Sequence, residues 1–157
     1  MCFQEKAFAE TSLEDLQALV RTNVVPTWLG MKEVMPAIRT HGGGYIVNVV
    51  SSLGRVAHPG AAVFSALAGG VRIATKSAAL EGAKRTPRVI ANVVLVGDVP
   101  VRGCDGSSTS MTGLGIGPAI DPADVAAAVA QLAGDDSDYV TGMEIYLDGG
   151  YAAVAAR

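Results

Sequence analysis

Tyr45-Ile-Val-Asn-Val-Val50 is the stretch of this chain that decides its fold. Apolar and β-branched residues occupy both faces of the extended segment, which is typical of a strand buried inside a parallel sheet. Val89-Ile-Ala-Asn-Val-Val-Leu-Val96 repeats the pattern, and Gly142-Met-Glu-Ile-Tyr-Leu147 is predicted to be the last strand. A sheet of about three strands follows, and it needs helices to cover both faces.

Helical segments are predicted before and between these strands. Ser12-Leu-Glu-Asp15 begins one of them, because the serine side chain accepts a free backbone N–H and the acids lie in the positive first turn. The alternation predicts one α/β domain over residues 1–157, a doubly wound parallel sheet with flanking helices. The expected helices run from Ser12 towards Asn23 with a break near Pro26, through Trp28 and Met35 to His41, from Ala61 to about Lys84, and from Asp121 to about Ala133, and a long loop covers Gly97 to Ala119.

The composition excludes several classes of protein. Hydrophobic residues make up 50% of the 157 residues and the net charge is −3, without a basic stripe, so nucleic acid is not an expected partner. No apolar run reaches the ~18 residues that a membrane span needs, and the N-terminus lacks a signal-peptide pattern. Cys2 and Cys104 form no disulfide framework, which favours a reducing cytoplasm. No metal site is predicted.

The predicted helix after residue 61 carries a family resemblance. Phe64-Ser-Ala-Leu-Ala68-Gly-Gly-Val-Arg-Ile-Ala-Thr-Lys-Ser-Ala-Ala-Leu-Glu81 resembles the catalytic helix of the short-chain dehydrogenases/reductases. Gly43-Gly-Tyr-Ile-Val-Asn-Val-Val-Ser51 resembles the strand of that family that ends in the catalytic serine, and Asp148-Gly-Gly-Tyr151 resembles its tail. From about Thr11 to Tyr151 the chain is similar to the C-terminal part of the family, which implies a truncated doubly wound, Rossmann-like sheet of about three strands.

The same resemblance identifies missing groups. The family has a tyrosine at position 64, whose hydroxyl donates a proton to the substrate carbonyl, and a lysine at position 68, which holds the nicotinamide ribose. Phe64 has no proton to donate and Ala68 has no charge. The family's opening strand, glycine-rich turn and helix, which bind the cofactor pyrophosphate, have no counterpart here. The chain by itself is therefore expected to bind no NAD(P) cofactor in the family's way.

The resemblance also has a consequence for assembly. The family pairs the strand at Ile46 to Val50 with earlier strands, so here that strand is expected to be an open, apolar edge that invites pairing. The family's usual dimer uses helices that correspond to Trp28–Ile38 and Phe64–Leu80. We therefore expect a homo-oligomer, or a heteromer with a related full-length protein.

Four polar residues are candidates for a catalytic site. Ser51 matches the family's serine and is a candidate donor to a substrate carbonyl, although a hydroxyl that caps the loop after a strand explains it equally well. His58 is a candidate proton carrier, with simple exposure as the alternative. Asp98 follows a strand end, where ligands bind in this fold, or is an exposed turn residue. Asn23 matches the family's active-site asparagine, or has a structural role.

Three functions are compatible with these residues. The first is a non-redox enzyme of isomerase, lyase or cyclase type that acts on an apolar carbonyl-containing small molecule, for example in a biosynthetic pathway, with Ser51 as oxyanion donor and His58 or Asp98 as acid or base. The second is a non-catalytic pseudoenzyme that serves as the partner subunit of a full-length relative. A residual oxidoreductase is a further alternative. Because function must be argued from the site, the missing proton donor and ribose anchor favour the first.

Overall fold

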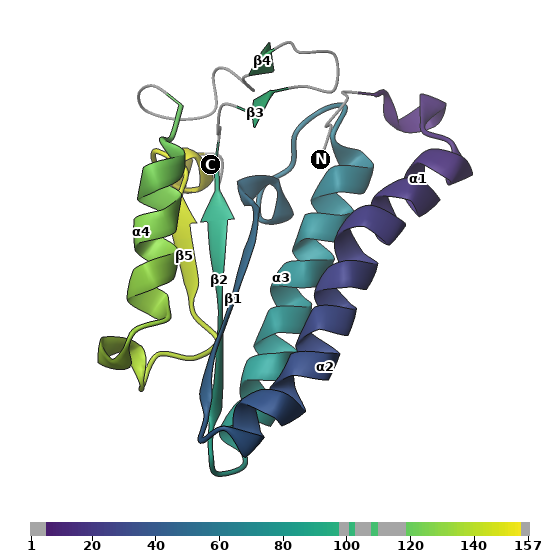
Figure 1. The fold of residues 1–157 in the computed structure, drawn as a ribbon. Coiled ribbons are helices and arrows are strands. Elements are labelled where there is room, and N and C mark those ends of the chain that lie inside the picture. The colour runs from purple at the N-terminus through teal and green to yellow at the C-terminus, as the bar shows by residue number, and fades with distance from the viewer. Residues whose placement is uncertain (1–5, 98–100, 103–107, 110–118, 155–157) are drawn as a thin grey trace.

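The computed structural model describes residues 6–97, 101–102, 108–109 and 119–154. It has three layers, in which a parallel sheet lies between α2 and α3 on one face and α4 on the other (Figure 1). The strand order is β1-β2-β5, and both pairings are parallel. The main elements are α1 (Leu13–Leu19), α2 (Val25–Thr40), β1 (Gly44–Ser51), α3 (Ala62–Ala83), β2 (Val89–Val96), α4 (Pro122–Leu132), β5 (Glu144–Leu147) and α5 (Tyr151–Val154).

The prediction of a Rossmann-like parallel sheet of about three strands with flanking helices is confirmed by this topology. Strand β2 lies in the middle and every one of its residues is buried, as its continuous apolar sequence predicts. Strand β1 pairs with it along its full length, from Gly44 opposite Val89 to Ser51 opposite Val96. Among the described residues, β1 and β5 each pair with β2 alone, so each has one free edge.

Small residues bring α3 close to the strands. A Cβ added to Gly82 would lie 2.1 Å from the carbonyl oxygen of Val89, and a Cβ added to Gly54 would lie 2.7 Å from the carbonyl carbon of Ala68. Both distances are shorter than any side chain tolerates. The two glycines therefore let the backbone of α3 approach β2 at one end and η3 (Ser52–Gly54) at the other.

The first helical segment differs from its prediction. Ser12 and Asp15 form the expected capping box. The expected break near Pro26 is instead a π-helical segment, η2 (Val20–Val24), after which α2 starts with Pro26 in its first turn. Proline is tolerated there because the first helical N–H groups have no carbonyl partner in the helix. The helix therefore continues through the proline.

Short elements occur where the sequence predicted loops. The segment predicted as a loop from Gly97 to Ala119 contains β3 (Val101–Arg102) and β4 (Ser108–Thr109), which pair antiparallel. Two-residue strands leave no recognisable hydrophobic alternation in a sequence. The remaining short helices are η1 (Phe8–Glu10) and η4 (Asp135–Ser137).

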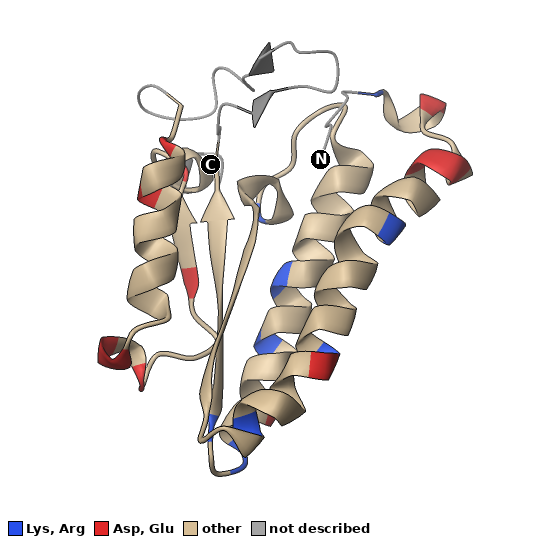
Figure 2. Cartoon of the chain, in the orientation of Figure 1, with Lys and Arg blue, Asp and Glu red and all other residues tan. Residues whose placement is uncertain are grey.

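Charges are separated along the strand direction. Basic side chains gather at the end where α2 and α3 finish and β1 and β2 begin, whereas acids predominate at η1, α1 and both ends of α4 (Figure 2). The basic end includes Arg39, Lys84, Arg85 and Arg88. Cations at this place stabilise the negative C-terminal ends of two helices. In the part of the chain that the structure describes, no helix is long and apolar enough to cross a membrane.

Candidate functional site

Ser51 is the last residue of β1, at the carboxyl edge of the sheet where this fold binds ligands. Its Oγ accepts a hydrogen bond of 3.2 Å from the backbone N–H of Leu53 and so caps η3. A serine hydroxyl that accepts one bond keeps its own proton for donation. Both interpretations of Ser51 are therefore compatible, since one hydroxyl holds the turn and still offers a donor.

The turn after Ser51 lies against α3, the helix whose sequence resembles the catalytic helix of the family. Gly54 packs directly on the backbone of Ala68 and Gly69 in α3, and Ala68 is 8% exposed. Phe64 lies one turn earlier, in the first turn of α3, and is half-buried. The structure thus brings the Ser51 turn next to the helix positions that lack a proton donor and a cation.

Asn23 lies within the π-helical segment η2, and η2 lies against α3. Its Nδ2 donates to the carbonyl oxygen of Leu19 at 2.8 Å and to Oγ1 of Thr22 at 2.9 Å. The backbone carbonyl oxygen of Asn23 accepts a hydrogen bond of 2.8 Å from Oγ1 of Thr27. Single π-helical turns inside α-helices occur frequently at functional sites. The side chain of Asn23 stabilises such a turn.

His58 lies in the loop between η3 and α3 and is half-buried. The carbonyl oxygen of His58 accepts from the backbone N–H of Ala61 at 3.2 Å, which shapes the entry to α3. The N–H of Lys6 donates to the carbonyl oxygen of Gly60 at 3.0 Å, so the N-terminal segment lies on the same loop. Asp98, the fourth predicted residue, lies outside the described residues.

A charged cluster between α3 and β5 was not predicted. Oε1 of Glu144 contacts Nη1 of Arg72 at 2.8 Å and Nζ of Lys76 at 2.5 Å, and its Oε2 accepts from the hydroxyl of Tyr146 at 2.5 Å. The side chain of Glu144 is 11% exposed. Arg72 and Lys76 are four residues apart on one helix face, and Glu144 and Tyr146 share one face of a strand. Those spacings were the available signal.

Partial burial raises the pKa of Glu144, but the opposing effects are larger. Hydrogen bonds from Lys76 and Tyr146 and the charge of Arg72 lower it, so the pKa of this carboxyl lies below its ordinary value of 4.5. Burial and the carboxylate together raise the pKa of Tyr146. Glu144 is therefore ionised at neutral pH while Tyr146 keeps its proton, and the contacts of Glu144 hold β5 to α3. Among the residues that the structure describes, no group of three or more His, Cys, Asp or Glu could hold a metal ion.

Comparison with known proteins identifies the family. The sequence model described as enoyl-(acyl carrier protein) reductase matches residues 1–152. The chain belongs to the short-chain dehydrogenase/reductase family. Cyclopentanol dehydrogenase of Comamonas testosteroni is 34% identical over 153 residues, which cover 94% of this chain and 61% of that protein. The 2,5-dichloro-2,5-cyclohexadiene-1,4-diol dehydrogenase LinX of Sphingobium indicum is 32% identical, covering 92% of this chain and 59% of LinX.

A solved structure shows the same fold. The acetoin dehydrogenase from Enterobacter cloacae superposes with a TM-score of 0.84 at 24% identity, covering 99% of this chain and 62% of that chain. The chain thus spans about three-fifths of the length of these members of the short-chain dehydrogenase/reductase family.

These findings correct the functional expectation. The predictions of a non-redox enzyme and of a pseudoenzyme subunit are wrong, because the relatives that match more than nine-tenths of the chain are named dehydrogenases. These relatives point to oxidoreductase chemistry, and they also remove the support for the prediction that the protein works without a cofactor. The prediction gave too much weight to Phe64 and Ala68. Phe64 and Ala68 are two side chains on one helix face, whereas the match to dehydrogenases extends over 92–94% of the chain.

Proposed function

We propose that the protein is a nicotinamide-dependent oxidoreductase that interconverts a secondary alcohol on an alicyclic ring and the corresponding ketone. The observation that carries this proposal is the similarity to two dehydrogenases whose named substrates are a cyclopentanol and a cyclohexadienediol, at 34% and 32% identity. Both substrates carry a hydroxyl on a five- or six-membered carbon ring. The reaction class is therefore the oxidation of such an alcohol or its reverse.

Ser51 is the residue that we assign to the substrate carbonyl. Its hydroxyl lies at the carboxyl edge of β1 and keeps a donor proton, so it would bind the oxygen on which negative charge develops. A bound nicotinamide would supply the hydride. The described residues fit the substrate side of such a site, but Ala68 contributes no cation towards the ribose. Weak dinucleotide affinity is expected.

Proton transfer needs a different group from the family's tyrosine, because Phe64 has none to donate. We assign this role to His58, whose loop joins the Ser51 turn to the first turn of α3. A positioned proton donor contributes roughly 10²–10⁴-fold to such reactions. Asn23 is assigned a supporting role, since it holds the helix turn that lies against α3. Asp98, which follows Gly97 in the sequence, is proposed as a further acid or base.

The test is reduction of cyclopentanone by the purified protein, with NADH and NADPH supplied separately and the loss of the reduced cofactor followed by absorbance. We expect slow turnover with at least one cofactor, accompanied by binding of that cofactor in calorimetry. The proposal fails if neither cofactor binds and no cyclic ketone or alcohol is turned over.

The role of His58 has a matched control in the other histidine. His41 lies at the C-terminus of α2, where Nδ1 makes a hydrogen bond of 2.8 Å with the carbonyl oxygen of Ala37. It precedes β1, whereas Ser51 ends that strand, and the strand spans about 23 Å between its first and last residues. His58→Ala should lower turnover by about 100-fold, and His41→Ala should leave it unchanged. Equal effects of both substitutions would contradict the assignment.

Two further properties belong to this proposal. We infer a cytoplasmic location from the cysteine usage, which suits a reducing compartment. We also infer assembly through α2 and α3, either as a homo-oligomer or with a related full-length protein. The exposed apolar side chains that support this are Trp28 (54% exposed), Ile73 (50%) and Leu80 (69%).

A further inference from the structure

Asn48 is the one polar side chain in the middle of β1, and it points into the layer between sheet and helices. It lies two residues after Ile46, which packs in the core cluster with Met31 and Ala79, so both side chains share the face that α2 and α3 cover. Asn48 is half-buried there. A polar group in this layer needs hydrogen-bond partners.

Its partners come from both covering helices. Nδ2 of Asn48 donates to Oγ1 of Thr75 in α3 at 2.8 Å and to Sδ of Met31 in α2 at 3.2 Å. Thr75 is 1% exposed, and its hydroxyl donates to the carbonyl oxygen of Val71 at 2.8 Å. The threonine hydroxyl therefore has both a donor and an acceptor partner, which fixes its direction.

The apolar contacts around this bond do not fix the position of α3 along β1, and the ion pairs of Arg72 and Lys76 reach β5 instead. Around this bond α3 presents small buried residues to the strands, among them Val71, Ala78 and Ala79, and such contacts are non-directional. The close approaches of Gly54 and Gly82 set how near the helix lies. A directional hydrogen bond between a strand and a helix sets where along its axis the helix lies.

This axial position matters at the candidate site. Asn48 is three residues before Ser51 on one strand, about 10 Å away. Thr75 is on the same unbroken helix as Phe64, eleven residues later and about 16 Å away. A shift of α3 along β1 therefore moves the first turn of α3 relative to the Ser51 hydroxyl by the same amount.

We propose that Asn48 and Thr75 are positioning residues that set the axial register of β1 on α3, and with it the separation between the Ser51 hydroxyl and the first turn of α3. The proposal rests on the assignment of Ser51 to the substrate. Neither residue touches the substrate. Misplacement of a reacting group by about 1 Å can cost on the order of 100-fold in rate, so the register has a measurable consequence.

The experiment compares Thr75→Val, which removes the hydroxyl and keeps the shape, with Thr75→Ser, which keeps the hydroxyl. Thr75→Val should lower kcat by roughly 10- to 100-fold with KM within about twofold, and Thr75→Ser should restore kcat. A second readout needs no activity. The Leu53 amide, which donates to Ser51, should exchange its hydrogen faster in Thr75→Val, as measured by NMR.

A double variant separates positioning from stability. In Asn48→Leu with Thr75→Val both partners are apolar, so neither leaves an unsatisfied group and the melting temperature should recover. The kcat and the Leu53 exchange rate should not recover. Recovery of kcat and of the Leu53 exchange rate in the double variant would overturn the proposal. An unchanged Leu53 exchange rate in Thr75→Val would overturn it as well. If neither the unaltered chain nor any variant turns over a substrate, the proposed function fails. The exchange rate of the Leu53 amide then still tests whether Asn48 and Thr75 set the register of β1 on α3.

Discussion

Ser51 illustrates how one hydroxyl serves structure and chemistry together. Its lone pair caps η3 through the Leu53 N–H, and its proton is the donor that we assign to the substrate oxygen. Ser51→Ala should lower turnover by about 100-fold or more, since one oxyanion donor is lost. The lost cap should cost about 1 kcal/mol, so the fold should persist. Steady-state kinetics and thermal unfolding measure the two effects.

Ser52 is the matched control for this prediction. It is the next residue, it is 3% exposed, and its backbone carbonyl rather than its side chain accepts from Arg55. Ser52→Ala should leave turnover within about threefold, because no proton donor to the substrate is removed. If Ser51→Ala and Ser52→Ala behave alike, Ser51 is only a structural cap.

Phe64 gives the second prediction at this scale. A tyrosine in its place supplies the hydroxyl that the family uses as proton donor, and proton donation of this kind contributes roughly 10²–10⁴-fold. Phe64→Tyr combined with Ala68→Lys should therefore raise the rate of cyclopentanone reduction at least about tenfold, and Phe64→Leu should not. Dinucleotide affinity should rise with the added lysine. If the double variant is folded but reduces cyclopentanone no faster than the unaltered chain, residue 64 does not face the reacting carbonyl.

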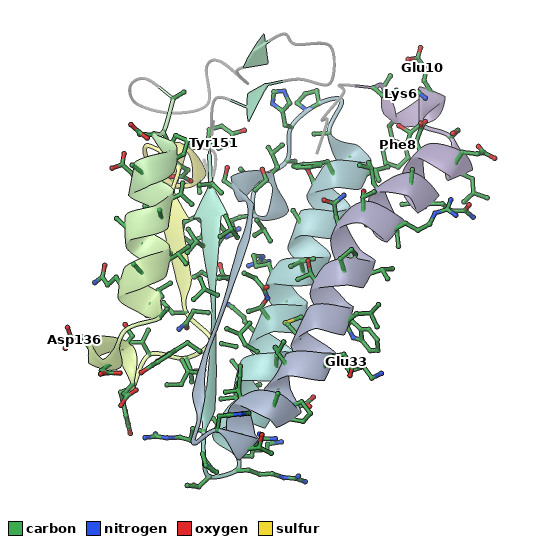
Figure 3. The ribbon with its side chains drawn as sticks, viewed as in Figure 1. Lys6, Phe8, Glu10, Glu33, Asp136 and Tyr151 are labelled. Atoms are coloured by element: carbon green, nitrogen blue, oxygen red, sulfur yellow. The ribbon has the colours of Figure 1, made fainter. Side chains whose placement is uncertain are left out.

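At the scale of elements, the cluster of Arg72, Lys76, Glu144 and Tyr146 is a clamp, that is, a set of ion pairs and hydrogen bonds that holds the edge strand β5 to α3. Within the described part of the chain, the four-residue strand β5 pairs with β2 alone, and Arg72 and Lys76 of α3 reach the carboxylate of Glu144. Glu144→Gln leaves two partly buried cations without their partner and should cost about 1–3 kcal/mol of unfolding free energy. Glu33→Gln is the control, because Glu33 lies on the exposed face of α2 (Figure 3) and its ion pair is with the neighbouring, exposed Lys32.

The clamp also predicts a pH dependence. The folded-state pKa of Glu144 is lowered below its ordinary value of 4.5. The carboxylate therefore contributes its stabilisation fully above pH 4.5 and loses it as the pH falls through the lower folded-state pKa. The difference in melting temperature between the unaltered chain and Glu144→Gln should be large at pH 7 and should shrink below pH 4. A difference that stays constant over this range would contradict the clamp.

The sequence predicts long elements well because their pattern is redundant. Strand β2 is apolar at nearly every position, and the observed bounds, Val89–Val96, equal the predicted ones. The cap at Ser12 and the start of α4 after Asp121 are also found as predicted, since each depends on a few adjacent residues. The π-helical segment η2 depends on packing against α3 and leaves no periodic signal, so it was missed.

The candidate site was predictable only in part. Ser51 was predicted from the resemblance of its strand to the family's strand that ends in the catalytic serine. The packing of its turn on Ala68 had no local sequence signal, because it depends on the close approach of Gly54 in three dimensions. The cluster at Glu144 joins residues 72 positions apart and escaped for the same reason. Function was misjudged because the prediction relied on Phe64, Ala68 and the missing opening unit of the family, whereas the similarity to dehydrogenases extends over 92–94% of the chain.

At the scale of the whole molecule, α3 presents an apolar stripe to solvent. Ala66, Gly70, Ile73, Ser77 and Leu80 are all exposed and follow one another at alternating spacings of four and three residues, which is the spacing of a helix–helix seam. Trp28 of the neighbouring α2 is 54% exposed. Exposed apolar side chains that form a continuous surface favour association. We therefore expect a dimer in which α3 and α2 face their counterparts.

Light scattering at micromolar concentration should give twice the 16.0 kDa mass of the chain. Ile73→Glu should return it to the monomer mass, because a charge would be buried in an apolar seam. Tyr139→Glu is the control, since Tyr139 is 91% exposed in the loop between η4 and β5, away from the seam.

The free edge of β1 is the competing surface for association, and Val49 on this strand is 47% exposed. If Val49→Lys separates the copies and Ile73→Glu does not, the copies pair through β1, and a single 16.0 kDa species for the unaltered chain would exclude both interfaces.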